Sequence, residues 1–229
     1  MLFKLHTTDL SPFGQRAKLA LRTKGLLPQT ELNDTFGGTD ALGELAPMRQ
    51  IPILEHDGFV LPESQVIVDY LEELATGTSL LPKHPRSRAI ARLLVRITDL
   101  YIAPHFLTLI VGMRSPTDPA KMTEAFTAFN KGLGFAEQYL QSENFTREQQ
   151  GSETEKTYAV GQTLSIADIA LAPFLFYVPR LAEWHGHDAF PSAHKCAAYL
   201  SAIAKTEHIH KAFIEMEIAY KARIDMLKN

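Results

Sequence analysis

The hydrophobic pattern of the chain changes near residue 85, and this change constrains the fold more than any other feature. Before it, short apolar runs alternate with turn-forming residues, which is typical of strands and helices in succession. Beyond it, apolar residues recur at the i, i+3, i+4 spacing of amphipathic helices, with almost no strand pattern. The stretches with helical spacing are Arg88 to Met113, Lys121 to Leu140, Ser165 to Leu181, Ser192 to Ile203 and His208 to Leu227. The sequence therefore predicts an α/β N-terminal domain followed by an all-α C-terminal domain.

The segment from Gly77 to Pro85 connects these two patterns. It holds one glycine, two prolines and several small polar residues, a composition that suits a linker. We expect an N-terminal domain at residues 1–79, a linker at 80–85 and a helical domain at 86–229. A Gly-rich connection at Gly37-Gly38 and a polar stretch at 142–158 are predicted to be loops.

The first domain has a β-α-β order followed by β-β-α. Ser11-Pro12 is a helix start, because serine is a favoured N-cap and proline is tolerated at the first helical position. His56-Asp57-Gly58 is a hairpin signal, and we expect Ser64 to be the N-cap of the next helix. The predicted strands are Leu2 to His6, Thr30 to Asn33, Gln50 to Leu54 and Phe59 to Leu61.

Composition excludes several classes of function. The chain has 229 residues and a net charge of −3, so its bulk charge does not attract nucleic acid or anionic membranes. Its longest apolar stretches, such as Ile169 to Val178, are too short to span a bilayer. A single cysteine, Cys196, excludes a disulfide framework and a cysteine-based zinc cluster, and the pair His185 and His187 has no evident third ligand. We therefore expect a cytoplasmic protein with no metal, no nucleic-acid partner and no membrane segment.

Several short motifs, each weak alone, stand out along the chain: Ser11-Pro12-Phe13-Gly14-Gln15-Arg16, Gln50-Ile51-Pro52, Glu63-Ser64 with Val66-Ile67, and Ser165-Ile166-Ala167-Asp168. In their order and spacing they resemble the motifs of glutathione transferases. The resemblance covers nearly the whole chain, and its first motif looks most like the tau class and, with serine in place of cysteine, the omega class. It implies a thioredoxin-like N-terminal domain that binds glutathione, followed by an all-helical domain that forms the hydrophobic substrate side.

The resemblance also implies that Ser11 is the catalytic residue. The thiol of glutathione has a pKa near that of cysteine, roughly 8.5, and the thiolate is the nucleophile. A serine hydroxyl at the start of a helix can donate a hydrogen bond to the sulfur, while the helix amides add the positive end of a dipole. Ser11 would then stabilise the thiolate without acting as a base. The alternative is that Ser11 only caps its helix.

Four further residues are expected to bind glutathione. Pro52 resembles the cis-proline of thioredoxin-like folds, which would turn the backbone of Ile51 toward the cysteinyl residue. Gln50 would reach the glycyl end. Ser64, at a helix start, suits the γ-glutamyl carboxylate, and Glu63 would accept a hydrogen bond from the γ-glutamyl ammonium.

The motif Ser165-x-x-Asp168 has a different role, because it is a capping box that precedes an apolar run. In the family that the chain resembles, the matching motif serves folding of the helical domain. We assign it no catalytic role and expect Asp168→Ala to lower stability by about 1 kcal/mol.

The second substrate is expected to be a small, largely apolar electrophile. Leu10, Phe13, Tyr101 and His105 are candidates for its pocket, although for any one of them taken alone an ordinary core position is the favoured interpretation. The resemblance also implies a homodimer, for which the helices at Ser64 to Leu74 and Arg88 to Met113 offer apolar residues.

Two other readings of the sequence are considered. Serine in place of the omega-class cysteine argues against thiol transfer, and the absence of the zeta-class serine-and-cysteine cluster disfavours maleylacetoacetate isomerisation. A non-catalytic binding or regulatory protein on the same fold, of the stringent starvation protein A type, is the alternative to an enzyme. The complete set of glutathione contacts beside Ser11 favours the enzyme.

Overall fold

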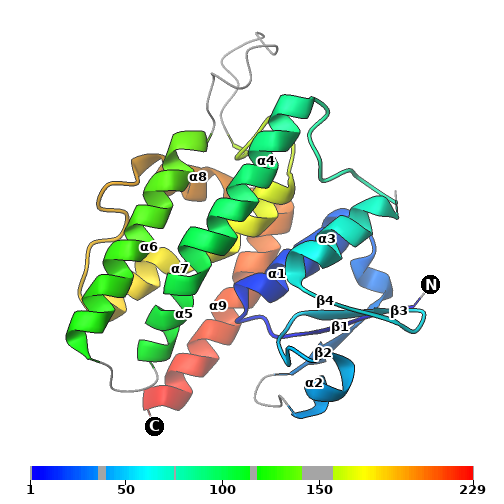
Figure 1. Ribbon diagram of the computed structural model, residues 1–229, viewed down its shortest axis with the longest axis horizontal. Helices are drawn as coiled ribbons and strands as arrows, with labels where there is room; N and C mark the ends of the chain where they lie inside the picture. The colour runs from blue at the N-terminus through cyan, green and yellow to red at the C-terminus, as the bar shows by residue number, and fades with distance from the viewer. Residues whose placement is uncertain (1, 36–39, 75, 114–117, 141–156, 229) are drawn as a thin grey trace. The chain divides into compact units, whose positions relative to one another are not determined.

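The computed structural model describes residues 2–35, 40–74, 76–113, 118–140 and 157–228 (Figure 1). Gly37-Gly38 and most of the polar stretch predicted at 142–158 lie outside these residues. The chain forms two compact units, which are described separately. Unit 1 comprises Met1–Leu80 together with Glu207–Asn229, and unit 2 comprises Leu81–Thr206.

Unit 1 is built on a four-stranded sheet with the order β2-β1-β3-β4. Its strands are β1 (Phe3–Thr7), β2 (Thr30–Asp34), β3 (Ile53–His56) and β4 (Phe59–Pro62). The β1–β2 pair is parallel, and the β1–β3 and β3–β4 pairs are antiparallel. The β-α-β then β-β-α order is therefore confirmed, and the third strand begins at Ile53, later than predicted.

Helices cover both faces of this sheet. The helices of unit 1 are α1 (Pro12–Thr23), the 3₁₀ turn η1 (Leu27–Gln29), α2 (Asp40–Leu45), α3 (Ser64–Glu73) and α9 (Glu207–Lys228). Helices α1 and α3 lie on one face and the short α2 on the other (Figure 1). Phe3, Leu5 and Leu54 are fully buried, whereas Ile53 packs with Leu42 of α2 in a smaller cluster. The alternation of side chains along each strand supplies both layers.

A glycine lets the first turn of α1 approach the end of β1. A Cβ atom on Gly14 would lie 1.9 Å from Oγ1 of Thr7, so a larger residue fits there only if the Thr7 side chain moves. Ser11 is the N-cap of α1, with Pro12 in the first turn, and Gly25 adopts a φ of 71° just beyond the helix. The predicted start and end of this helix are therefore confirmed.

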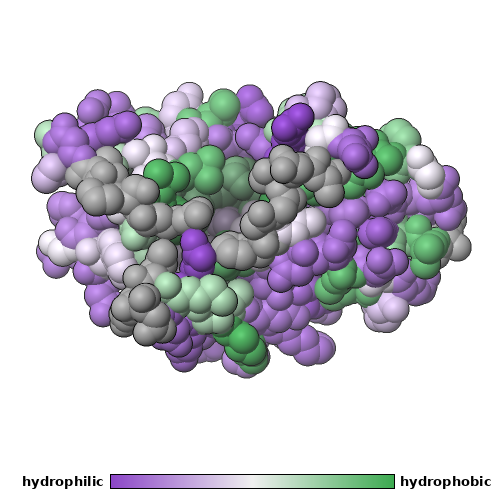
Figure 2. All heavy atoms as spheres, turned by 90° about the horizontal axis from the view of Figure 1, so that it is seen from below, coloured by the Kyte–Doolittle hydropathy of each residue, from purple (hydrophilic) through white to green (hydrophobic). Residues whose placement is uncertain are grey.

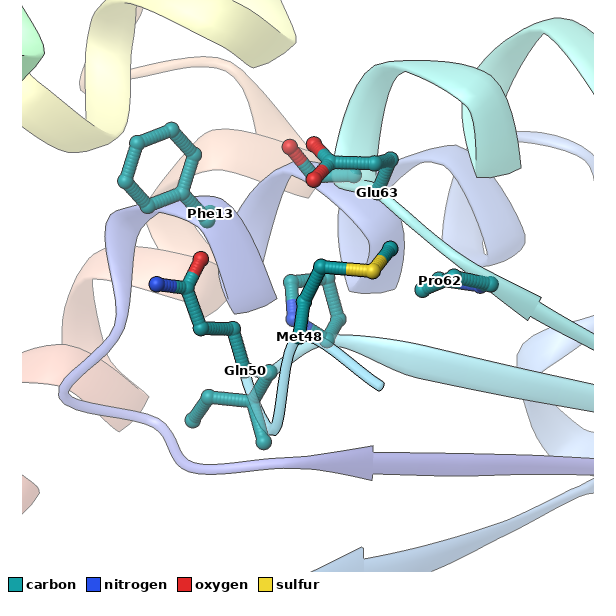
Figure 3. Close-up of a pocket in the computed structure, with 8 residues that line it drawn as sticks. Phe13, Met48, Gln50, Pro62 and Glu63 are labelled. Atoms are coloured by element: carbon teal, nitrogen blue, oxygen red, sulfur yellow. The ribbon is translucent and has the colours of Figure 1, made fainter. Parts of the chain in front are cut away.

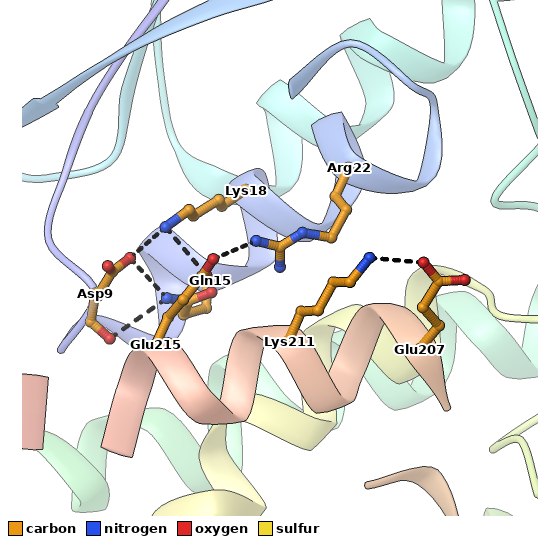
Figure 4. A network of polar contacts seen from close by, with 7 residues as sticks. All are labelled: Asp9, Gln15, Lys18, Arg22, Glu207, Lys211 and Glu215. Carbon is orange, nitrogen blue, oxygen red and sulfur yellow. Dashed lines mark hydrogen bonds and ion pairs between the residues drawn. The ribbon is translucent and has the colours of Figure 1, made fainter. Parts of the chain in front are cut away.

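Helix α9 is held against α1 by a network of charged groups within unit 1 (Figure 4). Oε2 of Glu215 lies 3.1 Å from Nζ of Lys18, and Oε1 of Glu215 lies 2.6 Å from Nη2 of Arg22. Lys18 also pairs with Asp9 at 2.6 Å. Burial alone would raise the pKa of the Glu215 carboxyl, but the hydrogen bond from Arg22 and the two positive charges lower it below its usual value.

These contacts group the last helix with the first part of the chain. The sequence predicts one helical domain at residues 86–229, whereas the compact units group Glu207–Asn229 with unit 1. Contacts between α1 and α9 account for this grouping, and they include the ion pairs of Glu215 with Lys18 and Arg22, cations that are largely buried on α1. The break between the units, at Leu80 and Leu81, falls within the predicted linker at 80–85.

Every regular element in the described part of unit 2 is helical, as the sequence predicts. These are α4 (Pro85–Ile97), the π-helical turn η2 (Thr98–Ile102), α5 (Ala103–Gly112), α6 (Pro119–Tyr139), α7 (Ile166–His185) and α8 (His194–Ile203). Helix α7 is the most deeply buried, with an almost continuous run of buried residues from Ile166 to Val178. It contacts α4, α5 and α8, so its apolar sequence forms the centre of this unit.

The N-terminus of α7 is capped by the side chains of Ser165 and Asp168. Oδ2 of Asp168 accepts hydrogen bonds from the backbone amide and the hydroxyl of Ser165, each at 2.8 Å. Oδ1 of Asp168 accepts from the amide of Ala159 at 2.7 Å and from the hydroxyl of Tyr199 at 2.9 Å. Complete burial raises the pKa of the Asp168 carboxyl, against the lowering effect of these hydrogen bonds. The predicted capping box is therefore present and extends further than a local cap.

One helical stretch is longer and more apolar than the sequence analysis recognised. Pro85–Gly112 has 28 residues and a mean hydropathy of 1.5 in its most apolar window, enough by length and composition to cross a membrane. That window is 44% buried within the protein, and α4 packs on α6 and α7. The core helix of a soluble protein passes the same test. Hydrophilic side chains dominate the face in Figure 2, and hydrophobic ones gather in separate patches.

Candidate functional site

A pocket in unit 1 lies at the meeting point of three segments: the start of α1, the residues before β3, and the start of α3. It is lined by Phe13, Met48, Gln50, Ile51, Pro52, Pro62, Glu63 and Ser64. Figure 3 shows Phe13 and Glu63 on one side of the pocket and Gln50 and Met48 on the other. Polar side chains thus converge with apolar ones on a single space, and such polar groups can fix the orientation of a small ligand.

The segment before β3 supplies two of the predicted glutathione contacts. Gln50 and Ile51 precede the strand, and the Ile51–Pro52 peptide bond is cis, as the resemblance implied. Gln50 is exposed and Ile51 is half-buried. Arg49 does not line the pocket, since its guanidinium lies against Gly43 of α2.

The start of α3 supplies the other two predicted contacts, Glu63 and Ser64. Glu63, rather than Ser64, is the N-cap, so the predicted cap position is wrong by one residue. Glu63 has a φ of 72°, which is unusual for a residue with a side chain. Within the described part of the chain, no side chain caps the first-turn amides of α3. The hydroxyl of Ser64 instead accepts a hydrogen bond from Nη1 of Arg16 at 3.3 Å.

Ser11 lies at the start of α1, just before Phe13. Its Oγ accepts a hydrogen bond from the amide of Gly14 at 3.1 Å, so it caps the helix as predicted. A hydroxyl that accepts one hydrogen bond keeps its own proton for donation to another acceptor. The two roles considered for Ser11, helix cap and thiolate donor, are therefore chemically compatible. Ser11 is half-buried and is not itself among the residues that line the pocket.

The residues predicted for the second substrate belong to different units. Leu10 and Phe13 are in unit 1, whereas Tyr101 and His105 are in unit 2. Tyr101 is 47% exposed, and its ring packs edge-on against Phe135 with centroids 5.2 Å apart. Phe13 lines the pocket of unit 1. A pocket formed by all four residues stays a prediction.

Three residues of this region were not singled out as ligand contacts by the sequence analysis. Met48 and Pro62 line the pocket, and Arg16, which does not line it, donates a hydrogen bond to Ser64. Arg16 belongs to the first motif of the sequence, and Met48 and Pro62 flank the second and third motifs. Their proximity to those motifs is the one sequence signal that they lie near the site. Whether each side chain points into the pocket depends on the tertiary structure and has no local signal.

Other candidate reactive groups take part in packing. Cys196 is fully buried, its Sγ lies 3.7 Å from the carbonyl oxygen of Leu133, and burial raises the pKa of its thiol. The ring of His187 stacks on Phe126 with centroids 4.2 Å apart. No cluster of three or more His, Cys, Asp or Glu side chains suited to a metal occurs among the residues that the structure describes.

Comparison with known proteins identifies the family. Residues 5–79 match the model of the glutathione S-transferase N-terminal domain, and residues 99–200 match that of the glutathione S-transferase C-terminal domain. The chain belongs to the glutathione S-transferase family. This membership confirms the resemblance and the two-part fold, and it makes the chain a glutathione-dependent enzyme. Because both matched models describe an enzyme family, they give no support to the non-catalytic alternative.

Individual relatives of this family member carry two kinds of name. Maleylacetoacetate isomerase of Rattus norvegicus is 29% identical over 209 residues, covering 88% of this chain and 83% of the rat protein. Glutathione S-transferase U3 of Arabidopsis thaliana is 32% identical over 115 residues, which cover 49% of this chain and 48% of the Arabidopsis protein. The structure of rice GST1 in complex with glutathione has a TM-score of 0.74 at 24% identity, over 99% of this chain and 96% of that one. Maleylacetoacetate isomerases are therefore among the relatives of a chain that lacks the zeta-class serine-and-cysteine cluster.

Proposed function

We propose that the chain is a glutathione transferase that binds glutathione in the pocket of unit 1 and stabilises its thiolate with Ser11. The substrate would be a small electrophile that accepts the sulfur by addition or by displacement of a leaving group. The pocket is the observation that carries this proposal. Four residues expected to bind glutathione from separate motifs, Gln50, Ile51, Glu63 and Ser64, line it together.

The charges around the pocket suit the ends of the tripeptide. Glutathione carries an ammonium and a carboxylate on its γ-glutamyl residue and a second carboxylate on its glycine. The open first turn of α3 presents amide groups and the positive end of a helix dipole to an anion. The adjacent Glu63 carboxylate is an acceptor for the ammonium, and the exposed amide of Gln50 is a donor for the distant carboxylate. Hydrogen-bonding groups of both kinds are therefore within one site.

The role of Ser11 is tested by the thiol pKa of bound glutathione. The thiolate absorbs in the ultraviolet, so its fraction can be followed against pH for the wild type, Ser11→Ala and Ser11→Thr. We expect the wild type and Ser11→Thr to lower the thiol pKa, and Ser11→Ala to bind glutathione without that shift. One unit of this shift corresponds to about 1.4 kcal/mol of thiolate stabilisation.

A control is needed because Ser11 also caps α1. Thermal unfolding of both variants separates a lost cap, which costs about 1 kcal/mol, from a lost thiolate contact. An unshifted thiol pKa in the wild type would exclude thiolate stabilisation. Equal pKa values in the wild type and Ser11→Ala would assign the stabilisation to another group.

Glutathione-dependent isomerisation is a second candidate function, which the rat maleylacetoacetate isomerase at 29% identity favours. In this reaction the thiolate would add to a carbon–carbon double bond of maleylacetoacetate, the resulting single bond would rotate, and elimination would return the thiolate. A transferase consumes one glutathione per product, whereas an isomerase regenerates it. Measuring free thiol during turnover therefore distinguishes the two reactions.

The proposed enzyme would act as a homodimer, as the resemblance implied. Large apolar side chains are exposed at Val66 on α3 and at Leu100, Leu107 and Val111 along the stretch from η2 to α5. They fall within the two helical segments predicted to offer an interface. Sedimentation equilibrium would test the dimer, and a single species at 25.6 kDa would exclude it. The cytoplasmic location stays a prediction.

A further inference from the structure

Arg16 is a charged residue in an unusual position. It lies in the second turn of α1, is 1% exposed, and is among the largest fully buried side chains of the protein. Burying a guanidinium is costly unless its surroundings compensate the lost hydration. A residue retained under that cost calls for a structural or functional reason.

Its contacts reach two walls of the glutathione pocket. On one side, Nη1 of Arg16 donates a hydrogen bond to Oγ of Ser64 at 3.3 Å. On the other, the Cζ atom of Arg16 lies 5.6 Å from the centre of the Phe13 ring, within the range of a cation–π contact. Ser64 and Phe13 both line the pocket. Arg16 therefore joins the wall that α1 provides to the wall that α3 provides.

The hydrogen bond also fixes what the Ser64 hydroxyl can do. A guanidinium has donors and no acceptor, so the oxygen of Ser64 must be the acceptor in this contact. The single hydroxyl proton of Ser64 then points elsewhere and is available to a ligand. Hydrogen bonding to a cation polarises the hydroxyl and strengthens it as a donor. A carboxylate, which only accepts hydrogen bonds, is the matching ligand group.

We infer that Arg16 is a positioning residue that makes Ser64 a dedicated donor to the γ-glutamyl carboxylate. This inference rests on the proposed function, because it assumes that glutathione occupies this pocket. Arg16 acts through Ser64 and does not touch the ligand. Its removal weakens recognition of the γ-glutamyl carboxylate and leaves binding of the remaining dipeptide unchanged.

The test is a double-mutant cycle between Arg16→Lys and Ser64→Ala, with dissociation constants measured by calorimetry. Two probes are used: glutathione, and cysteinylglycine, which lacks the γ-glutamyl residue. Arg16→Lys keeps the charge but loses the planar fork. We expect it to raise the Kd of glutathione about tenfold and that of cysteinylglycine less than twofold. In the Ser64→Ala background the same change adds less than a twofold effect, since the hydroxyl it orients is gone.

Arg22 supplies a matched control on the same helix. Its guanidinium is also largely buried, but it pairs with Glu215 and is not part of the pocket. Arg22→Lys is therefore expected to lower thermal stability without changing the Kd of either probe. A purely structural role for Arg16 predicts the same behaviour for Arg16→Lys, and that result would overturn the inference.

Other outcomes are equally decisive. Additive effects of Arg16→Lys and Ser64→Ala, or equal weakening of both probes, would overturn the inference while leaving the proposed function intact. Absence of glutathione binding in the wild type would overturn both. If Arg16→Lys does not fold, Ser64→Ala tests the bond from its other end. We expect Ser64→Ala to raise the Kd of glutathione about tenfold and to leave the Kd of cysteinylglycine unchanged. An equal rise in both Kd values would contradict the inference.

Discussion

Helices α3 and α7 both begin at a Glu/Ser or Ser/Asp motif, yet their first turns are arranged in opposite ways. At α7, the Asp168 carboxylate accepts four hydrogen bonds and is completely buried. At α3, the N-cap Glu63 is exposed, has a φ of 72°, and makes no side-chain cap. The corresponding positions of α3 hold Glu63 at the N-cap and Val66 at N3, so α3 has no counterpart of the Ser/Asp capping box.

The difference separates stability from ligand binding within one chain. The first turn of an α-helix always leaves backbone amides without partners inside the helix. The start of α7 is capped by Ser165 and Asp168, which belong to the same unit. This capping favours folding and leaves few hydrogen-bonding groups for a ligand. Helix α3 leaves its start open to the pocket, which costs stability and, under the proposed function, provides a site for the γ-glutamyl carboxylate. Three predictions test whether this contrast is real.

The largest effect is expected from Asp168→Ala. The sequence suggested a loss of about 1 kcal/mol for a simple cap, but four donors lose their acceptor in the folded protein. Because each buried unsatisfied donor costs about 1–3 kcal/mol, we expect urea unfolding to show a loss of at least about 3 kcal/mol. The Kd of glutathione in the remaining folded protein stays within twofold of the wild type.

Tyr199→Phe provides a graded control for this prediction. It removes only one of the four hydrogen bonds to Asp168, so the expected loss is about 1 kcal/mol. Unchanged unfolding of Asp168→Ala together with lost turnover would contradict the structural role of Asp168 and place it in the catalytic machinery.

Ser64→Ala is expected to have the second-largest effect, and this effect is on glutathione binding and not on stability. The Kd of glutathione should rise about tenfold, which corresponds to about 1.4 kcal/mol. Stability should change by about 1 kcal/mol or less, because water in the open pocket can replace the hydroxyl beside Arg16. Calorimetry and urea unfolding on the same sample measure both quantities. A large loss of stability with an unchanged Kd of glutathione would mean that Ser64 stabilises the fold, as Asp168 does at α7, and does not bind the ligand.

The smallest effect is expected from comparing Glu63→Gly with Glu63→Ala. Both variants lose the carboxylate and should weaken glutathione binding equally. Only alanine keeps a Cβ atom at a φ of 72°, where glycine is unstrained. We therefore expect the glycine variant to be more stable by about 1 kcal/mol, the reverse of the usual order within helices. Greater stability of the alanine variant would show that the start of α3 is not strained.

The two helix starts also show what the sequence could and could not predict. Ser165 and Asp168 form a local pattern with one reading, and the structure confirmed it. At α3 the sequence favoured Ser64 as the cap, because serine is a far better N-cap residue than glutamate. The actual cap depends on the backbone conformation of Glu63 and on the attraction of Ser64 to Arg16, two features without a local signal.

The same distinction applies elsewhere in the molecule. The strands, the start of α1 and the helices of unit 2 follow from short-range periodicity, so their positions could be predicted to within a few residues. Helix α2 has only six residues, too few for a periodic pattern. The bond between Arg22 and Glu215 joins residues 193 positions apart. Nothing in the sequence near either residue indicates such a partner.

The grouping of α9 with the N-terminal residues has a consequence for biosynthesis. Unit 1 is assembled from both ends of the chain, and the whole sequence of unit 2 lies between its parts. Lys18 can pair early with Asp9, but the Glu215 carboxylate that pairs with Arg22 is made only near the end of synthesis. On the ribosome, the strands and first helices of unit 1 therefore emerge early, but their packing against α9 can form only after unit 2 has been synthesised. Of the two units, unit 1 is therefore the first to emerge and the second to be completed.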